Sequence, residues 1–168
     1  MDWLKSKKIQ MVFQMLSFKE REHLKFSDKR GNLTILEHDV DDIKWDRTII
    51  AENKKKHTFR GMHYQYPSNQ IKYIKVIKGR IIDFIYNLET DELESYVLDS
   101  DNSLLVPSNY AHGYLTLEPN TIVSYLISGE YVPKDEVVIP YTEIDELVTE
   151  LSGINNITIS DKDLRVNP

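Results

Sequence analysis

One short stretch of the chain combines side chains that can bind an anion and move a proton. Arg60 and His63 belong to the sequence Arg-Gly-Met-His-Tyr-Gln, and Lys72 follows shortly afterwards. The surrounding residues have the composition of β-strands, and strands that close a barrel line its cavity with alternate side chains. Arginine and lysine attract anions, whereas histidine titrates near neutral pH. The stretch therefore indicates a cavity for an anionic small molecule that undergoes proton transfer.

For Arg60 and His63 to enter one cavity, the strand that carries them must bend. Alternate residues of a regular strand share a face, so His63 points together with Gln65 and Gly61, whereas Arg60 has the opposite parity. A bulge or bend costs least at glycine. We therefore expect the backbone to bend at Gly61.

Two further charged residues lie among aliphatic side chains on the strands that follow. Lys72 shares a strand face with Ile74, and Asp83 shares one with Ile81 and Ile85. A charged group on the inner face of a barrel is costly unless it is paired or functional. If their strands are neighbours, Lys72 and Asp83 can pair.

Short strands separated by polar turns make up most of the chain. The expected strands are Leu33–Leu36, Thr48–Ala51, Thr58–Gln65, Ile71–Ile77, Arg80–Leu88, Leu93–Leu98, Ser103–Val106, Ala111–Leu117 and Thr121–Ile127. Strands at intervals of about 8–12 residues with polar turns are typical of an antiparallel sandwich or barrel. The chain is therefore expected to be all-β.

The two ends of the chain differ from this pattern. Near the C-terminus, aliphatic residues repeat at helical spacing: Ile144, Leu147, Val148 and Leu151. Thr142 and Asp145 have capping-box spacing before this helix, and Gly153 can end it. At the other end, Ile9–Phe13 could form a strand and Ser17–Leu24 one or two helical turns. At 168 residues the chain fits a single domain, with 1–25 as an N-terminal extension and 141–168 as a C-terminal segment.

Composition narrows the class of partner. The net charge of −6 argues against nucleic acid or an anionic membrane as the main partner, because both need basic patches. The basic run Lys54 to His57 is short and reads as a solvated loop, with phosphate steering as the alternative. The absence of cysteine excludes disulfides, thiolate zinc sites and a thiol nucleophile. No signal-peptide core or membrane-spanning apolar run occurs, so a cytoplasmic protein is expected.

A metal site is an alternative interpretation of the histidines. A barrel with His63, Gln65 and His112 resembles a cupin, in which a His-x-His pair, a downstream glutamate and a late histidine usually bind the metal. Here Gln65 replaces the second histidine, and no glutamate lies between Gln65 and Gly79. Two histidines alone make a poor catalytic metal site. We therefore expect neither a metal nor another cofactor.

Several motifs occur together in a characteristic order. They are Arg60 to Gln65, Gln70 to Lys72, Val106 to Tyr114 (VPSNYAHGY), the pair Tyr125 and Tyr131, and Ser160 to Asp163 (SDKD). This set resembles the dTDP-4-dehydrorhamnose 3,5-epimerase family of cupin-fold sugar-nucleotide epimerases. Its members carry R-G-L-H-[YF]-Q, Q-x-K-L, I-P-x-x-[FY]-A-H-G-F, a Tyr-x5-Tyr pair and S-x-K-D. Asp28 to Gly31 resembles the family's D-x-R-G element, and the resemblance covers about residues 26–163.

The resemblance implies a fold, a reaction and a set of catalytic residues. The fold would be a cupin-type antiparallel barrel, or jelly roll, with a few short peripheral helices. The substrate would be a nucleotide-linked 4-keto-6-deoxyhexose, whose protons at C3 and C5 lie α to the carbonyl and leave as an enolate forms. His63 matches the family's base and Asp163 its partner. Lys72 matches the lysine near the C4 oxygen, and Tyr125 matches the acid on the opposite face.

The resemblance also implies how the substrate is held. Arg30 and Arg60 match residues that contact the diphosphate or nucleotide, since a guanidinium binds phosphate in a bidentate manner. The other expected binding residues are Gln65, Asp83, His112 and Tyr131. The family further implies a homodimer that acts without metal in the biosynthesis of deoxysugars for surface polysaccharides.

The chain departs from the family pattern where the nucleotide is bound. Asn32, Leu33 and Ile35 stand in place of aromatics and a glutamate, and Ile50 to Asn53 replaces a Gln-x-Asn element. A different nucleotide or sugar, or one epimerised centre instead of two, therefore stays open. Two other functions also stay open. A keto-sugar isomerase would move the carbonyl from C4 to C3 without needing Tyr125 as an acid, and a non-catalytic cupin would bind the sugar nucleotide without exchanging protons.

Overall fold

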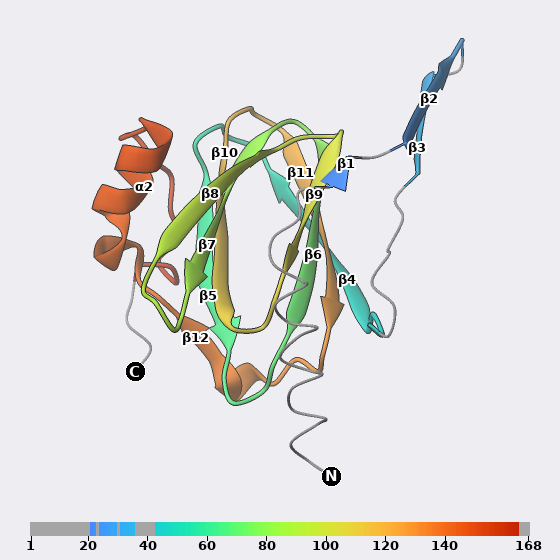
Figure 1. The fold of residues 1–168 in the computed structure, drawn as a ribbon. Helices are drawn as coiled ribbons and strands as arrows, with labels where there is room; N and C mark the ends of the chain where they lie inside the picture. Colours follow the sequence, from blue (N-terminus) through green and yellow to red (C-terminus); the bar gives the residue numbers. More distant parts are fainter. Residues whose placement is uncertain (1–20, 23, 30, 36–42, 165–168) are drawn as a thin grey trace.

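The computed structural model describes residues 21–22, 24–29, 31–35 and 43–164, and most of these lie in antiparallel sheets (Figure 1). The first sheet contains β1 (Arg21–Glu22), β4 (Arg47–Asn53), β6 (Ile71–Lys78), β9 (Asn102–Val106) and β11 (Thr121–Ser128). The second contains β5 (Phe59–Gln65), β7 (Ile81–Asn87), β8 (Leu93–Leu98), β10 (Tyr110–Thr116) and β12 (Glu136–Val138). A separate hairpin consists of β2 (Leu24–Asp28) and β3 (Gly31–Ile35).

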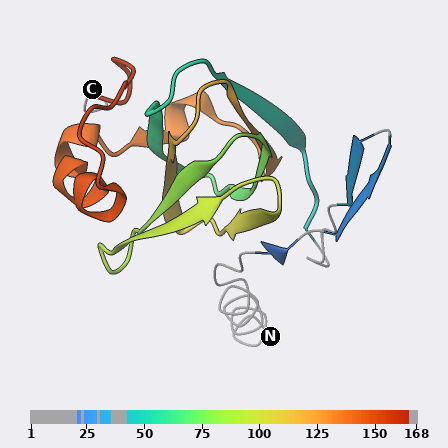
Figure 2. The same ribbon diagram turned by 90° about the horizontal axis from the view of Figure 1, so that it is seen from above.

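The two larger sheets form a cupin-type barrel. Their strand orders are β1-β9-β6-β11-β4 and β12-β5-β10-β7-β8. The view from above shows the sheets facing each other around the centre of the domain (Figure 2). Consecutive strands such as β6 and β7 lie in different sheets, as in a jelly roll. The predicted all-β antiparallel fold is thus confirmed, with the expected strands in place and their ends shifted by one or two residues.

Differences from the prediction concern short elements. The strands β1, β2 and β12 were not expected from the sequence. The helical turns expected over Ser17–Leu24 are wrong where they can be compared, because Arg21–Glu22 is a strand and Leu24 begins another. The strand expected over Ile9–Phe13 lies outside the described residues.

At one part of the barrel, mostly aliphatic side chains fill the interior between the two sheets. The buried cluster contains Ile74, Val76, Ile81, Ile85, Leu98, Leu104, Val106, Tyr114 and Val123, which come from both sheets. Removing this apolar surface from water is the main driving force that holds the sheets together.

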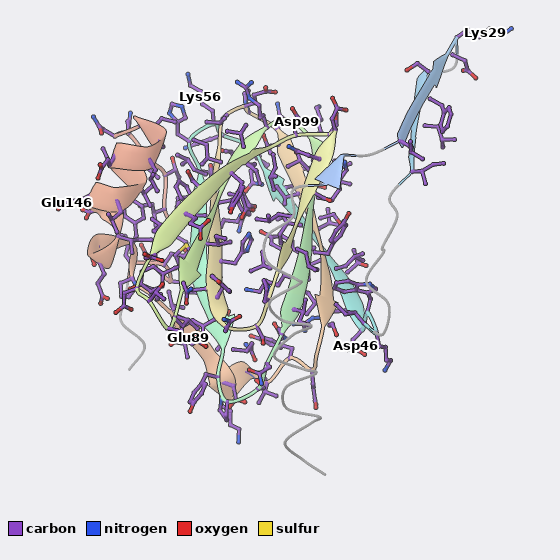
Figure 3. The ribbon with its side chains drawn as sticks, viewed as in Figure 1. Lys29, Asp46, Lys56, Glu89, Asp99 and Glu146 are labelled. Atoms are coloured by element: carbon purple, nitrogen blue, oxygen red, sulfur yellow. The ribbon has the colours of Figure 1, made fainter. Side chains whose placement is uncertain are left out.

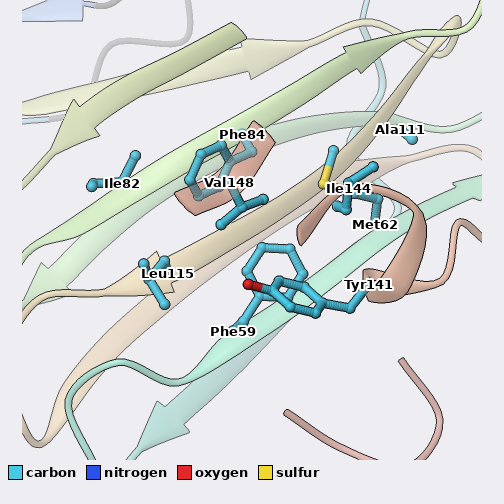
Figure 4. Packing of buried hydrophobic residues seen from close by; sticks show 9 residues of the cluster. All are labelled: Phe59, Met62, Ile82, Phe84, Ala111, Leu115, Tyr141, Ile144 and Val148. Carbon is cyan, nitrogen blue, oxygen red and sulfur yellow. The ribbon is translucent and has the colours of Figure 1, made fainter. Parts of the chain in front are cut away.

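A second cluster attaches the C-terminal segment to the outside of the second sheet (Figure 4). Tyr141 of the 3-10 helix η2 (Tyr141–Glu143) packs edge-on against Phe59, with ring centroids 4.9 Å apart. Ile144 and Val148 add to this contact from the start and the inner face of α2 (Asp145–Ser152). This packing brings the residues after α2 back to β5, which matters for the site below.

The predicted C-terminal helix is confirmed, but its start is wrong. Thr142 lies in η2, and the N-cap of α2 is Ile144, whose side chain makes no capping hydrogen bond. Gly153 ends α2 in the left-handed conformation with φ 70°, as the sequence predicted. No helix in the described ranges is long and apolar enough to cross a membrane.

Charged side chains cover much of the surface, and the hairpin is one of the places where apolar side chains are exposed. Charged side chains point outward from many elements, as the labelled residues of Figure 3 show: Lys29, Asp46, Lys56, Glu89, Asp99 and Glu146. The β2–β3 hairpin stands away from the barrel (Figure 1). Four of its apolar side chains are 41–64% exposed: Leu24, Phe26, Leu33 and Ile35.

Candidate active site

A cavity of about 310 Å³ lies between the two sheets and receives side chains from both. It brings together eight of the residues singled out in the sequence: Arg60, His63, Gln65, Lys72, His112, Tyr125, Tyr131 and Asp163. Two others behave differently. Asp83 lies behind His112 with no exposed surface, and Arg30 falls outside the described residues.

The predicted bend at Gly61 is confirmed. Gly61 has a φ of +130°, and the pairing of β5 with β10 shifts register between His112 and Tyr114. A Cβ atom on Gly61 would lie 2.4 Å from the Cα of Gly113, so only glycine fits this close crossing. Because of the bend, Arg60 and His63 both line the cavity despite their opposite parity.

His63 on β5 is held by a carboxylate from the C-terminal segment. Its Nε2 lies 2.7 Å from Oδ1 of Asp163, and the two side chains are 29% and 5% exposed. Burial by itself raises the pKa of the Asp163 carboxyl, but the hydrogen bond and charge of His63 and the N–H of Gly61 together lower it. The N–H of Tyr141 donates to the Asp163 carbonyl at 2.8 Å, so the packing of η2 fixes this partner in place. The arrangement suits a base whose imidazole must keep one orientation.

Lys72 reaches from the first sheet toward the backbone of the second. Its Nζ donates to the carbonyl oxygen of His63 at 2.8 Å. Burial lowers the pKa of the Lys72 ammonium from 10.5 to about 8, although the charges of Asp83 and Glu136 partly oppose this. Lys72 is therefore still a cation at neutral pH, and it lies next to His63.

The expected pair between Lys72 and Asp83 is wrong as a direct contact. Their strands β6 and β7 belong to different sheets, and Oδ2 of Asp83 instead lies 2.8 Å from Nε2 of His112. Burial raises the pKa of Asp83 and lowers that of His112, while the charge of each partner opposes both changes. Asp83 thus acts on Lys72 through its charge and reaches the cavity only through His112.

Tyr125 on β11 stands on the wall opposite His63. Its ring meets His112 edge-on, with centroids 5.8 Å apart, and lies 6.2 Å from the ring of Tyr114. Burial raises the pKa of Tyr125 well above its ordinary value, so the hydroxyl keeps its proton at neutral pH. The His63 imidazole on one sheet thus faces a protonated hydroxyl on the other.

The mouth of the cavity contains a polar cluster around Tyr131. Tyr131 lies beyond the end of β11 at Ser128, yet it lines the cavity together with Tyr125. The guanidinium of Arg47 lies 4.6 Å from the Tyr131 ring centroid. The Tyr131 hydroxyl donates to Glu136 at 3.3 Å, and Lys162 pairs with the same carboxylate at 2.8 Å.

Arg47, Glu136 and Lys162 line the cavity but were not singled out in the sequence. A signal existed for two of them. Lys162 belongs to the SDKD motif, and Arg47 directly precedes the expected strand Thr48–Ala51 with the parity of Ile49. Glu136 had none, because it lies on β12, a strand of three residues.

Arg60 and Gln65 are tied to neighbouring segments. The Nε of Arg60 donates to Oδ1 of Asn53 at 2.8 Å, while the side chain itself is exposed. The side-chain oxygen of Gln65 accepts from the N–H of Val132 at 3.3 Å and from the Ser68 hydroxyl at 3.1 Å. Within the described part of the chain, no group of three or more His, Cys, Asp or Glu is placed to hold a metal ion.

A cupin-type barrel with a histidine–carboxylate pair facing a buried tyrosine has the architecture of the sugar-nucleotide epimerase class. A family model described as dTDP-4-dehydrorhamnose 3,5-epimerase matches residues 16–168. The chain belongs to this family.

Characterised relatives and solved structures agree with this assignment. The dTDP-4-dehydrorhamnose 3,5-epimerase of Methanothermobacter thermautotrophicus is 31% identical over 122 residues, which cover 65% of this chain and 66% of the relative. That of Mycobacterium tuberculosis is 33% identical over 92 residues, covering 50% and 46%. The chain thus matches less than two thirds of the length of these relatives.

The matches to solved structures cover a larger share of both chains than the matches to these relatives. The Bacillus anthracis epimerase structure has a TM-score of 0.77 and 28% identity, covering 90% of this chain and 93% of that one. The Sulfolobus tokodaii structure has a TM-score of 0.75 and 30% identity, covering 89% and 93%.

Proposed function

We propose that the chain is a sugar-nucleotide epimerase. It inverts C3, C5 or both in a nucleoside-diphosphate 4-keto-6-deoxyhexose, for the biosynthesis of deoxysugars and surface polysaccharides. The observation that carries this proposal is the position of His63 and Tyr125 on opposite walls of one cavity. Inversion needs a proton to leave from one face of the sugar and another to arrive on the opposite face.

The reaction begins at His63. Because Nε2 is bound to Asp163, Nδ1 takes the proton from the carbon next to the C4 carbonyl. The electron pair of the broken C–H bond moves into the enolate, and the negative charge collects on the C4 oxygen. The Asp163 carboxylate stabilises the imidazolium that forms.

Lys72 acts on the enolate and Tyr125 completes the inversion. An ammonium in a water-poor cavity stabilises a developing oxyanion far better than it would in water. Tyr125 then donates its proton to the opposite face of the same carbon, the C4 carbonyl is restored, and solvent returns a proton to the tyrosine. His112, edge-on against Tyr125, supports the ring that delivers this proton.

The diphosphate of the proposed substrate is bound by arginine side chains. Arg60 is the anchor we propose, together with Arg30 from the part of the sequence that resembles D-x-R-G, because guanidinium groups bind phosphate oxygens in pairs. The Bacillus anthracis relative was solved with TDP and pyrophosphate bound, which supports a nucleoside diphosphate as the part of the substrate that these arginines bind. Gln65 and Tyr131 complete the proposed binding set.

We further propose that the chain forms a homodimer and works in the cytoplasm. The hairpin supports the dimer, because four apolar side chains on two short strands are too much exposed surface for an isolated element. A second copy of the chain would cover this surface. Sedimentation equilibrium at micromolar concentration tests this assembly.

The experiment that tests the function is incubation with a dTDP-4-keto-6-deoxyhexose in D₂O, followed by NMR of the sugar. Deuterium at C3 or C5 with inverted configuration is expected. A carbonyl moved to C3 would indicate a keto-sugar isomerase instead, and binding without exchange would indicate a non-catalytic cupin. Full exchange by a His63→Ala variant would refute the base assignment.

A further inference from the structure

Arg60 is an exposed side chain at the cavity, yet one of its nitrogens is bound to the protein. Its Nε donates to Oδ1 of Asn53 at 2.8 Å. Within the described part of the chain, the two terminal nitrogens of the guanidinium have no hydrogen-bond acceptor and no carboxylate partner. These two nitrogens are able to donate in parallel to two oxygens of one phosphate. The guanidinium is thus held at Nε and left open at the edge that a phosphate needs.

The hydrogen bond between Arg60 and Asn53 joins the two sheets. Asn53 is the last residue of β4, at the edge of the first sheet, whereas Arg60 lies on β5 of the second. Asn53 is only 3% exposed, although the arginine that it binds is exposed. A buried amide is costly unless its donors and its acceptor are all satisfied, so its partners indicate its purpose.

The amide of Asn53 is fixed in one orientation by two buried groups. Its Nδ2 donates to the carbonyl of Thr121 at 3.2 Å and to the hydroxyl oxygen of Tyr114 at 3.1 Å. The Tyr114 hydroxyl in turn donates to Oδ1 at 3.2 Å. Thr121 and Tyr114 have no exposed surface. Because a carbonyl only accepts and a guanidinium only donates, the NH₂ group of Asn53 must face Thr121 and its oxygen must face Arg60.

This arrangement reduces the cost of binding an anion. A free arginine on the surface has many rotamers, and a ligand that binds it must fix the side chain at a cost in entropy. The bond to Asn53 removes much of this freedom before any ligand arrives. A preorganised side chain of this kind binds more tightly without making any new contact.

We propose that Asn53 is a positioning residue for phosphate binding by Arg60, which rests on the epimerase function and the phosphate anchor proposed above. Asn53 holds Nε of Arg60, so that the two terminal nitrogens face the diphosphate of the sugar nucleotide. Tyr114 and Thr121 hold Asn53 from behind, and neither takes part in the binding itself.

The test measures the affinity for dTDP by isothermal titration calorimetry in the wild type, Asn53→Leu, Arg60→Met and the double variant. Leucine has about the size of asparagine but accepts no hydrogen bond. Asn53→Leu should weaken binding about tenfold, as expected when one long side chain must be immobilised by the ligand. Arg60→Met should weaken it about 10- to 100-fold, because a charged donor is lost. The double variant should bind as Arg60→Met does, because Asn53 acts through the arginine.

Tyr114→Phe is the matched control. It removes a buried partner of the same amide but leaves the contact between Asn53 and Arg60 in place. The control should lower the melting temperature and keep the affinity for dTDP within about twofold. If the Tyr114 hydroxyl left without Asn53 prevents Asn53→Leu from folding, Asn53→Leu combined with Tyr114→Phe removes both polar groups and provides the same readout.

Steady-state kinetics separate positioning from a structural role. Asn53→Leu should raise KM for the sugar nucleotide about tenfold and leave kcat nearly unchanged, because His63 and Tyr125 are untouched. A general loosening of the barrel would lower kcat as well.

The results that would overturn the proposal can be told apart from failure of the epimerase function. Wild-type affinity of Asn53→Leu for dTDP would refute the role of Asn53, and so would losses that add up in the double variant. Either result would leave proton exchange in D₂O intact. A protein that shows the expected pattern of dTDP affinities but exchanges no proton of a dTDP-4-keto-6-deoxyhexose would keep the role of Asn53 in phosphate binding and lose the epimerase function.

Discussion

Replacing Lys72 by methionine should abolish catalysis and stabilise the fold. The side chain keeps its length and its aliphatic contacts but loses the ammonium group that lies 2.8 Å from the carbonyl of His63. The two effects have different origins. Catalysis needs the positive charge near the enolate, whereas folding has to remove that charge from water.

The expected loss of activity follows from Coulomb's law. A charge pair about 4 Å apart at an effective dielectric constant of about 20 gains about 4 kcal/mol, which corresponds to roughly a 10³-fold change in rate. The wild type should show a related pH dependence, because a pKa of about 8 means that half of the ammonium is lost at that pH. Activity should therefore fall about tenfold for each pH unit above about 9.

The expected gain in stability follows from the same pKa. The folded value of about 8 lies below the value of 10.5 for free lysine, so the unfolded chain binds more protons between these two pH values. The cost of the buried charge is therefore fully present below pH 8 and disappears as the pH rises toward 10.5. After subtraction of the lost hydrogen bond, Lys72→Met should raise the unfolding free energy by about 1–2 kcal/mol, or the melting temperature by roughly 2–8 °C.

The assay pairs kinetics with calorimetry and uses Lys75→Met as the control. Lys75 lies on the same strand, is buried, and donates to the carbonyl of Ser100 at 2.6 Å, but it does not line the cavity. This control should keep the wild-type rate of exchange. The reasoning is refuted if Lys72→Met retains more than a tenth of the wild-type rate, or if its melting temperature falls at pH 7.

Three further predictions follow from the same structure. Asp163→Asn should slow exchange by roughly 10²–10⁴-fold because the imidazole loses its charged partner; since the pKa of Asp163 is lowered, its contribution to stability, measured by denaturant unfolding, should be present above pH 3.8 and lost at lower pH. Gly61→Ala should lower the unfolding free energy by about 2–4 kcal/mol, because its Cβ would lie 2.4 Å from the Cα of Gly113, and an unchanged melting temperature would contradict this. Phe26→Asp, which places a charge on the exposed hairpin, should shift sedimentation from dimer to monomer without altering the melting temperature of the barrel, whereas Lys29→Asp at the hairpin tip should not.

The residues that carry the proposed chemistry could be found in the sequence because each lies in a regular strand or a short motif. A single bend in β5 is enough to bring both Arg60 and His63 into one cavity. Because the two residues have opposite strand parity, the bend had to lie between them, and Gly61 was the residue where it costs least. Asp163 could be named from its motif, but its contact with His63 depends on Tyr141 packing against Phe59, which no local pattern reveals.

The sequence did not reveal the contact of Asp83 with His112 or the place of Glu136, because both depend on how the strands are distributed between the two sheets. The turn at Gly79 suggests that β6 and β7 are hairpin neighbours, which placed Lys72 beside Asp83. In the barrel the two strands lie in opposite sheets. Asp83 contacts His112 on β10, the strand that pairs with β7. Glu136 was missed for a similar reason, because a three-residue strand is too short to show alternation and only its pairing with β5 defines it.

The charge of Lys72 in the cavity depends on the buried pair of Asp83 and His112 behind it. In the proposed reaction Lys72 must remain an ammonium to stabilise an enolate, yet burial alone would push its pKa still lower than about 8. Asp83 opposes this effect from the other sheet, and His112 keeps the Asp83 carboxylate hydrogen-bonded where no water reaches it. A carboxylate in direct contact with Lys72 would neutralise the charge that the enolate needs. A carboxylate held one residue away behind His112 keeps the lysine protonated and leaves its ammonium free to act on the substrate.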